Sequence, residues 1–427
     1  MREVERWLRS EAWRTDPTRQ VFRLFGYAGT GKTTLAKHLA GGVEGRVVFA
    51  AYTGKAAHVL RQKGCPASTL HSAIYKPRER GAGRTKELEE QLKLALSTQL
   101  ALGPEPPPAM AGTLTLRSPQ HLAAEREIKV IEELLGSEKR AARRPLFTLS
   151  EDSDLQGAKL AVIDECSMVD EQMGVDLESF GVPILVLGDP MQLPPVGGGG
   201  HFTGTEKRPV TPDVLLDEVH RQAVDSPILW LATQVRYGNR VSVGKVGEGC
   251  CVVPYGTPEL RDVAQHADQI LVGRNVTRHA SNARYRQLMG MDAQPTPLPG
   301  DKLVCLRNDN EVGLLNGSLW RVHEAEHDAA GERMIMNISS EEEGPNGVSV
   351  EAHDAHFLGR ERDMPWWERK EKQEFDYGYA LTVHKAQGSQ WDDVMLFNES
   401  AAFREHRQRW LYTGITRAAK SLTIVQE

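Results

Sequence analysis

The sequence has few of the features that mark secreted, membrane-spanning or metal-stapled proteins. Its five cysteines include no C-x-x-C pair, which gives no indication of a zinc site or a disulfide framework. No run of about 18 apolar residues and no charged-then-apolar leader is present, so neither a membrane span nor a secretory signal is indicated. We therefore expect a cytoplasmic protein with no membrane partner.

The chain also lacks a positive net charge. Its formal net charge is -6, so any contact with nucleic acid must come from a local groove and not from bulk charge. At 427 residues, the chain is long enough for several domains with sizeable cores.

What the sequence does have is a phosphate-binding loop. The stretch GYAGTGKTT, which begins at Gly26, matches the template G-x-x-x-x-G-K-[ST] at every fixed position. VFRLF before it predicts a buried strand and KTTLAKHLA after it a helix, which is the context that such a loop requires. Backbone N–H groups of the loop and the helix N-terminus would bind phosphate, Lys32 would reach the terminal phosphates, and Thr33 would ligate Mg²⁺. We expect nucleotide contacts from Gly26, Ala28, Gly29, Thr30, Gly31, Lys32, Thr33 and Thr34.

Two carboxylates follow a second predicted strand. In KLAVIDECSMVD the apolar residues lead directly into Asp164 and Glu165. Asp164 suits the Mg²⁺ shell, and Glu165 is placed to deprotonate an attacking water. A third strand, in VPILVLGDPMQLPPV, is followed by Asp189 and Gln192, and Gln192 could sense the terminal phosphate. Successive strands that end in polar residues are typical of a doubly wound parallel sheet.

These segments belong to a longer ordered set. GYAGTGKTT, AYTGKAA, STLHS, VIDECSMVD, LGDPMQLPPV, HRQ, YALTVHKAQGSQWDDV and LYTGITRAAKSL occur in the order seen in superfamily 1 helicases. The chain most resembles the superfamily 1B, RecD-like and phage-type Dda branch from Val21 to Val425. The resemblance implies two RecA-like parallel-sheet domains with ATP between them, and translocation on single-stranded DNA from 5′ toward 3′.

The resemblance also assigns roles to residues of the predicted second domain. An ATPase that moves must couple hydrolysis to domain closure, so that domain should supply a cation to the charge developing on the phosphoryl group. Arg221 in DEVHRQA and Arg417 in GITRAAK match the family's phosphate-contacting arginines, and Gln387 and Gly388 are expected near the nucleotide.

Contacts to DNA are expected from polar loops that follow strands in both domains. In this family such loops contact backbone phosphate without base specificity. The first predicted domain supplies two loops and the second domain two more. The candidate residues are Thr53, Lys55, Thr69, His71, Arg274, Asn275, Thr277, Thr382, His384 and Lys385.

The predicted fold class is α/β with four parts. A first RecA-like domain covers 1–75 and 151–204, and a second covers 205–300 and 376–427. Residues 301–375 show short β-rich runs broken by Asn-Gly turns, which predict a small inserted SH3-like β-barrel. Residues 76–150 form an insertion in the first domain, where relatives carry a short strand-separating hairpin.

The insertion is predicted to be helical. Leu88, Leu92, Leu96 and Leu100 recur in steps of four, and Ile128, Ile131 and Leu135 mark a second helix. From residue 76 to 144 there are 13 Lys or Arg against 10 Glu, with a cluster at Lys139, Arg140, Arg143 and Arg144. We expect either an arm that holds a duplex junction electrostatically or a solvated helix pair docked on the core or on a partner.

The amino end departs from the family pattern. Relatives carry an adenine-reading glutamine roughly one helix ahead of the phosphate loop, whereas here Gln20 lies too close to Gly26 for that role. Either the chain begins late or its nucleotide selectivity is relaxed.

The sequence thus predicts an ATP- and Mg²⁺-dependent DNA helicase. It is expected to act as a monomer on single-stranded DNA and duplex junctions, with single-strand-binding or replication proteins as candidate partners. An RNA helicase or a protein-displacing translocase is the alternative. A protein-remodelling ring ATPase is disfavoured because it predicts a helical lid after one core domain, whereas a second strand-rich core follows here.

Overall fold

The computed structural model describes two compact units. One comprises Met1–Ile74 with Asp152–Glu427, and the other Tyr75–Glu151. The described residues are 2–77, 82–102, 119–142, 147–195, 199–205, 208–217, 225–309, 312–327, 333–341, 347–360 and 373–426.

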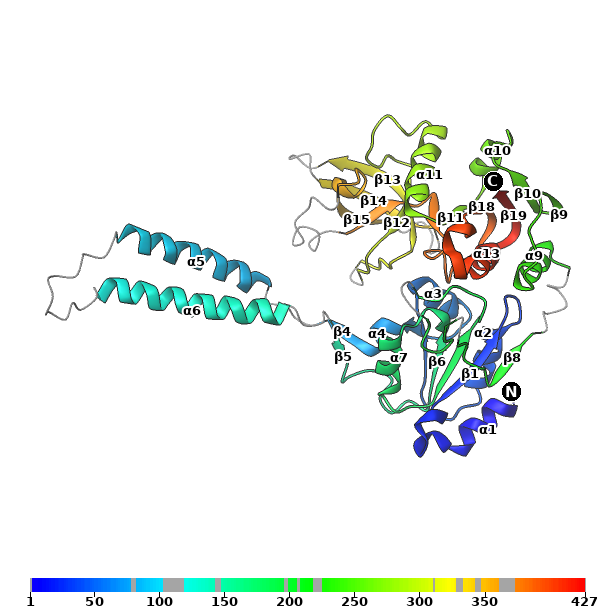
Figure 1. Cartoon of the computed structure of the whole chain (residues 1–427), viewed down its shortest axis with the longest axis horizontal. Helices are drawn as coiled ribbons and strands as arrows, with labels where there is room; N and C mark the ends of the chain where they lie inside the picture. Colours follow the sequence, from blue (N-terminus) through cyan, green and yellow to red (C-terminus); the bar gives the residue numbers. More distant parts are fainter. Residues whose placement is uncertain are drawn as a thin grey trace. The chain divides into compact units, whose positions relative to one another are not determined.

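A six-stranded parallel sheet forms the first core of the larger unit (Figure 1). Its order is β3-β2-β6-β7-β1-β8, and its central strands are apolar along their length, as strands covered on both faces must be. The strands are β1 Val21–Gly26, β2 Val47–Ala51, β3 Ala67–Thr69, β6 Leu160–Asp164, β7 Ile184–Gly188 and β8 Val214–Leu216. The α-helices of this part of the chain are α1 Arg2–Ser10, α2 Lys32–Ala40, α3 Gly54–Gln62, α4 Leu70–Ile74 and α7 Glu171–Glu178.

Strand β8 corrects the predicted end of the first domain at residue 204. It pairs in parallel with β1, so the first sheet extends to Leu216. The strand has only three residues, Val214–Leu216, which is too short for a strand period to be recognised in the sequence.

A second six-stranded sheet forms the second core. Its order is β17-β11-β18-β19-β10-β9, and it is parallel except for the edge strand β9. The strands are β9 Gly244–Gly247, β10 Cys250–Pro254, β11 Gln269–Val272, β17 Ala380–Thr382, β18 Trp391–Phe397 and β19 Ala418–Gln426. The helices are α9 Pro227–Arg236, α10 Leu260–His266, α11 Asn275–Leu288 and α13 Arg407–Ile415, with the 3-10 segment η5 Ser400–His406 before α13. The two parallel sheets confirm the predicted pair of RecA-like cores.

An antiparallel five-stranded sheet is inserted into the second core, where the hairpin pattern predicted β structure. Its order is β15-β14-β13-β12-β16. Alternate residues of β14, Met334, Met336 and Ile338, are buried, which is the period that a half-buried strand requires. The strands are β12 Lys302–Cys305, β13 Leu319–His327, β14 Arg333–Ser340, β15 Gly347–His353 and β16 Phe375–Tyr377. The comparison with an SH3-like barrel stays a prediction.

The smaller unit is a helix pair on a short β-ribbon. Helices α5 Ala82–Ala101 and α6 Pro119–Ala142 lie side by side (Figure 1), and β4 Tyr75–Pro77 pairs with β5 Phe147–Leu149. The predicted helices are therefore present. Their seam contains Leu88, Leu92 and Ala95 from α5 packed against Ile128, Ile131 and Leu135 from α6.

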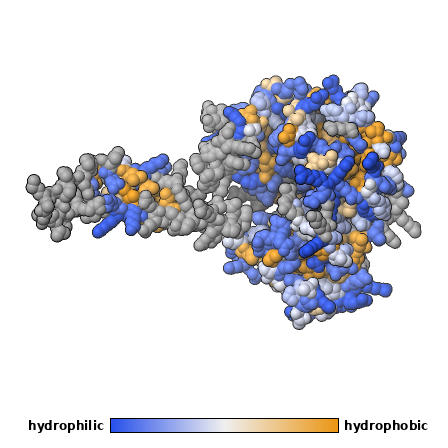
Figure 2. Space-filling model, in the orientation of Figure 1, coloured by the Kyte–Doolittle hydropathy of each residue, from blue (hydrophilic) through white to orange (hydrophobic). Residues whose placement is uncertain are grey.

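The predicted leucine stripe of α5 is wrong at Leu96. Its side chain is 46% exposed and Ala95 takes the place in the seam, because steps of four residues drift by about 40° each around a helix of 3.6 residues per turn. Leu94, Val130 and Leu134 are also exposed, and apolar surface is visible on this unit in Figure 2. The side chains of Leu100, Lys139 and Arg140, and residues Arg143 and Arg144, lie outside the described part. Within the described helices, none is long and apolar enough to span a bilayer.

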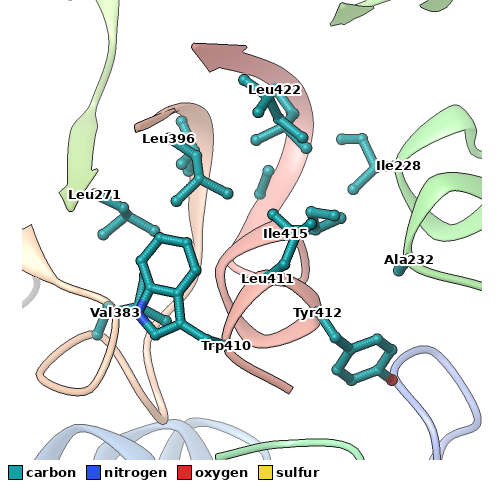
Figure 3. Close-up of a cluster of buried hydrophobic side chains, with 14 of the residues drawn as sticks. Ile228, Ala232, Leu271, Val383, Leu396, Trp410, Leu411, Tyr412, Ile415 and Leu422 are labelled. Carbon is teal, nitrogen blue, oxygen red and sulfur yellow. The ribbon is translucent and has the colours of Figure 1, made fainter. Parts of the chain in front are cut away.

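The largest buried cluster belongs to the second core and includes residues of the first. Trp410, Leu411, Tyr412 and Ile415 of α13 pack among strands and helices of the second core (Figure 3). Leu193, which follows β7 of the first core, belongs to the same cluster. Helix α13 is thus held by apolar burial at the place where the two cores meet.

Candidate functional site

The phosphate-binding loop has the conformation that its glycines allow. Gly29 and Gly31 adopt φ angles of 78° and 77°, a region that favours glycine. A Cβ added to Gly26 would lie 2.5 Å from the Thr30 hydroxyl oxygen, so that position also excludes a side chain. The loop joins β1 to α2, and Lys32 is the first residue of that helix.

Lys32 folds back over the loop. Its ammonium donates to the carbonyl oxygens of Gly26 (2.7 Å) and Tyr27 (3.2 Å). The ammonium charge therefore lies within the turn whose N–H groups would bind phosphate. An anion bound there would be stabilised both by the ammonium and by the N–H groups.

The two predicted metal-binding residues are in direct contact. The Thr33 hydroxyl donates to Asp164 Oδ2 at 2.9 Å, although the residues are far apart in sequence. Asp164 Oδ1 accepts the backbone N–H of Glu165 at 2.8 Å, which fixes the carboxylate at the end of β6. A hydroxyl and a carboxylate at this spacing are the oxygen ligands that Mg²⁺ takes beside nucleotide phosphates.

Glu165 combines backbone strain with an unusual electrostatic environment. Its φ and ψ of 55° and 41° are left-handed, a conformation that costs a non-glycine residue roughly 1–2 kcal/mol. Burial, and after it the charge of Asp164, raises the pKa of the Glu165 carboxyl, while Arg417 and Lys32 act in the opposite direction. Raising the pKa of a carboxylate makes it a stronger base, as deprotonation of water requires.

The third strand of the predicted site also ends in buried polar groups. Asp189, directly after β7, is 1% exposed, and its pKa is raised by burial and lowered by Lys32 and by hydrogen bonds. Gln192 is 7% exposed, and its side-chain oxygen has no hydrogen-bond partner among the described residues. A buried amide oxygen without a partner is uncommon in a finished core and is more often found at a functional site.

Arg417 is the cation that the second core places in this cluster. The side chain is 6% exposed and donates to the carbonyl oxygens of Thr413 (3.1 Å) and Ser389 (3.0 Å). Burial lowers the pKa of Arg417, while Glu165 and Asp189 raise it, so these charges interact across the two cores. Arg221, the other predicted arginine, lies outside the described residues.

Sequence reasoning missed Tyr412. The backbone N–H of Ala28 donates to its hydroxyl oxygen at 3.0 Å, and the hydroxyl donates to Asp189 Oδ2 at 2.7 Å. The residue lies within the quoted segment LYTGITRAAKSL, but nothing in the spacing separates it from its apolar neighbours.

Arg236 was missed as well. Its guanidinium carbon lies 3.9 Å from the centroid of the Tyr27 ring in the phosphate loop. This stacking adds a second cation of the second core beside that loop. Arg236 is the last residue of a predominantly apolar helix, where an arginine is usually a solvated terminus.

The two predicted nucleotide contacts of the YALTVHKAQGSQ segment lie where the cores meet. Gln387 is 3% exposed and donates to the carbonyl oxygen of Leu193 at 2.9 Å. Gly388 has a φ of 75°, and a Cβ there would lie 2.7 Å from the Thr53 hydroxyl oxygen. Gln387 therefore bonds the second core to a loop of the first, and Gly388 allows the two cores to approach closely at Thr53.

The predicted DNA-binding residues of the first core already serve its helices. Thr53 accepts the N–H of Ala56 and caps α3, and Thr69 likewise accepts the N–H of Ser72 in α4. The Lys55 ammonium lies 4.5 Å from the ring centroid of Trp391, and burial lowers the pKa of His71.

The predicted loop at the start of α11 holds a carboxylate of its own chain. Glu399 Oε2 accepts the backbone N–H groups of Gly273 (2.7 Å) and Arg274 (3.1 Å). Its other oxygen accepts the Arg274 guanidinium (2.9 Å) and the Thr277 hydroxyl (2.6 Å). The pKa of Glu399 is lowered because these donors outweigh burial. The Asn275 side-chain oxygen accepts from Arg278 at 3.3 Å.

The last predicted loop follows β17. Thr382 accepts the N–H of Lys385 at 3.3 Å, and the His384 ring lies 5.4 Å from that of Phe403. Burial, together with Arg278, lowers the pKa of Lys385 to about 8. Burial also lowers the pKa of His384, so its imidazole is neutral at pH 7.

Gln20 is unsuited to reading a base. It is 8% exposed, and its amide donates to the carbonyl oxygens of Glu178 (2.8 Å) and Val182 (3.0 Å). Its donors are therefore used in joining the start of β1 to the loop before β7.

Comparison with protein families gives two matches, one over most of the first core and one over the last strands and helix of the second. Residues 15–246 match the model of a family described as an AAA domain, and residues 377–425 match that of a UvrD-like helicase C-terminal domain.

Among individual proteins, an ATP-dependent RecD2 DNA helicase from Deinococcus radiodurans is 26% identical over 278 residues, which is 61% of this chain and 35% of the relative. A probable conjugal transfer protein TraA from Sinorhizobium fredii is 24% identical over 318 residues, or 64% of this chain and 26% of the relative. The matched part is thus about a third or less of each relative.

Among solved structures, a Pif1 helicase from Candida albicans is 17% identical, and the match covers 97% of this chain and 93% of that chain, with a TM-score of 0.48. Bacteroides Pif1 bound to ssDNA is 16% identical, and the match covers 94% of this chain and 88% of that chain, with a TM-score of 0.47.

Proposed function

This chain belongs to the AAA-domain family, and from that premise we propose that it is a superfamily 1B, ATP-dependent DNA helicase. It hydrolyses ATP between its two cores and translocates 5′ to 3′ on single-stranded DNA. Its substrates are single strands and duplex junctions, and it works as a monomer.

The observation that carries the proposal is the contact between Thr33 and Asp164. At 2.9 Å it joins the phosphate loop to the carboxylates at the end of β6. These two oxygens would hold Mg²⁺, which neutralises charge on the β- and γ-phosphates when it is bound. Lys32 would bind the same phosphates, and Glu165 would accept the proton of the attacking water.

A cation from the second core distinguishes a motor from a simple phosphate-binding domain. Arg417 is buried and interacts electrostatically with Glu165. In the closed arrangement of the cores, its charge would stabilise the transferred phosphoryl group. The rate of ATP hydrolysis would then depend on the distance between the cores. This dependence would couple hydrolysis to movement of the protein along a nucleic-acid strand.

DNA is the favoured nucleic acid because the RecD2 relative is described as a DNA helicase. An RNA helicase or a protein-displacing translocase is the alternative, since predicted phosphate contacts do not distinguish sugars. The 5′-to-3′ direction rests on the ordered motifs of the sequence.

One assay tests the activity, its direction and its nucleic acid. Unwinding and ATP hydrolysis are measured on duplexes with a 5′ tail, a 3′ tail or blunt ends, in DNA and in RNA, with ATP, without ATP, and with Lys32→Ala. The proposal requires ATP-dependent unwinding of the 5′-tailed DNA only, and none with Lys32→Ala.

Each deviation has its own meaning. Preference for the 3′ tail reverses the direction, preference for the RNA substrates replaces DNA, and ATP hydrolysis without strand separation favours the protein-displacing translocase. If nucleic acid stimulates ATP hydrolysis in none of the mixtures, the motor function itself is contradicted.

A further inference from the structure

One hydroxyl of the second core contacts two elements of the nucleotide site in the first. Tyr412, on α13, accepts the N–H of Ala28 at 3.0 Å and donates to Asp189 at 2.7 Å. Ala28 belongs to the phosphate loop after β1, and Asp189 directly follows β7. A single oxygen thus fixes the loop, the adjacent strand end and the opposite core relative to one another.

The rest of the Tyr412 side chain does not depend on that oxygen. The residue is 2% exposed, and its ring belongs to the apolar cluster around Trp410 and Ile415. In Figure 3 the oxygen points out of the cluster toward a loop in the blue of the amino-terminal part. The ring therefore holds α13 in its core, while the hydroxyl reaches across to the other core.

We propose that the Tyr412 hydroxyl is a positioning group that selectively stabilises the closed, hydrolysis-competent arrangement of the two cores. This inference rests on the proposed function. The hydroxyl acts through its two contacts, Ala28 of the phosphate loop and Asp189.

The hydroxyl favours the closed arrangement because its two partners, the Ala28 N–H and Asp189, differ in access to water between the open and closed arrangements. When the cores separate, water can satisfy both the Ala28 N–H and the Asp189 carboxylate. When they close, as here, Asp189 is buried and the Ala28 N–H is partly buried, so a missing hydroxyl leaves that N–H and Asp189 Oδ2 without their partner, while Oδ1 keeps the N–H of Met191. The cost of removing the oxygen therefore falls on the closed arrangement, where Arg417 reaches the site.

ATP binding by the first core should be affected far less. The groups that would bind phosphate, Lys32 and the N–H groups at the start of α2, belong to the first core. Tyr412→Phe keeps the ring and removes only the oxygen. We expect a kcat for DNA-stimulated hydrolysis that is lower by about tenfold or more, with KM for ATP changed by less than about threefold.

The chain offers a matched control in Tyr379. Its hydroxyl donates to Asp301 at 2.8 Å in a buried site that involves neither the phosphate loop nor Asp189. Tyr379→Phe therefore also removes one buried hydroxyl from a carboxylate. Wild type, Tyr412→Phe and Tyr379→Phe are compared in thermal unfolding, in steady-state hydrolysis and in binding of ADP with and without aluminium fluoride.

The proposal requires Tyr412→Phe alone to lose kcat and to lose affinity for ADP with aluminium fluoride, while ADP binding is retained. It is overturned if Tyr412→Phe matches Tyr379→Phe in both, or if its loss is confined to KM. The binding arm needs no turnover, so a wild type that binds both ligands without hydrolysing ATP contradicts the proposed function and still tests the hydroxyl.

Discussion

The nucleotide edge of the first core and the predicted DNA loops differ in how their polar side chains are used. At the nucleotide edge, Thr33 contacts Asp164 across the sheet, and the Gln192 amide oxygen has no partner among the described residues. In the loops, Thr53 caps its own helix and Arg274 binds Glu399. Side chains of the first set meet at the nucleotide edge or have an oxygen without a partner, whereas those of the second set are already bonded within their own core.

The difference shows how far a polar pattern specifies function. A phosphate loop needs glycines, a lysine and a hydroxyl at fixed spacing, and few structural purposes need the same set. Threonine or arginine at the start of a helix serves folding as well as phosphate binding, because both use the same donors and acceptors. The assignment of these residues to DNA binding therefore stays a prediction, and it is the part of the proposed site that experiments are best placed to revise.

The largest effect is expected at the nucleotide edge. Lys32→Ala should abolish hydrolysis, and Glu165→Gln should retain ATP binding while kcat falls by about 100-fold or more, because the amide cannot accept the proton. Since its pKa is raised, Glu165 should also set an acid limb of kcat above the usual glutamate range, with activity lost as pH falls.

Steady-state hydrolysis across pH with ATP-binding titrations provides the measurement, and the exposed Glu171→Gln is the control. Near-normal turnover in Glu165→Gln would remove it as the base.

The next largest effect is expected at Arg417. Arg417→Ala should lower kcat by roughly tenfold or more and change KM less, because the arginine acts on the transition state. Arg417→Lys should restore little, since an ammonium cannot reproduce the guanidinium bonds to Thr413 and Ser389. Thermal unfolding of both variants separates lost chemistry from lost structure. A change in KM alone would argue against the assignment.

A smaller effect is expected at Lys385, where the pH dependence of DNA binding tests whether the loop after β17 contacts phosphate. With a pKa of about 8, it is charged at pH 7 and largely neutral at pH 9, so an ammonium that binds phosphate there would be lost as pH rises. The affinity for single-stranded DNA should fall a few-fold between those values in the wild type and stay level in Lys385→Arg, whose charge persists. Titrations at constant ionic strength are the measurement, and parallel curves for the two proteins would exclude Lys385 from the contact.

The smallest effect is expected at Glu399. If Arg274 and Thr277 bind phosphate, the Glu399 carboxylate competes for the same donors. Glu399→Gln should then tighten binding of single strands a few-fold and steepen the log-log salt dependence by about 0.7. Fluorescence anisotropy across a salt series measures both. The control is Glu405→Gln, whose side chain is 66% exposed and lies within η5, the 3-10 segment that Glu399 precedes. An unchanged slope would make Glu399 a cap of α11 and nothing more.

The elements of the nucleotide edge could be predicted from the sequence because their requirements are local. The strand, loop and helix lie within residues 21–40, and the two carboxylates directly follow the apolar residues of β6. The contacts of Tyr412 and Glu399 could not be predicted, because each joins segments more than a hundred residues apart and neither residue type is distinctive there. Strand β8 escaped for a different reason, since its three residues carry no periodic pattern.

The left-handed backbone of Glu165 has a consequence for engineering. Glycine adopts that conformation without strain, so Glu165→Gly would relieve a local cost of roughly 1 kcal/mol while deleting the carboxylate. Selection for heat resistance alone would favour that exchange, and selection for turnover would reject it. In a library of variants, selection for stability would therefore enrich glycine at position 165, and selection for activity would enrich glutamate.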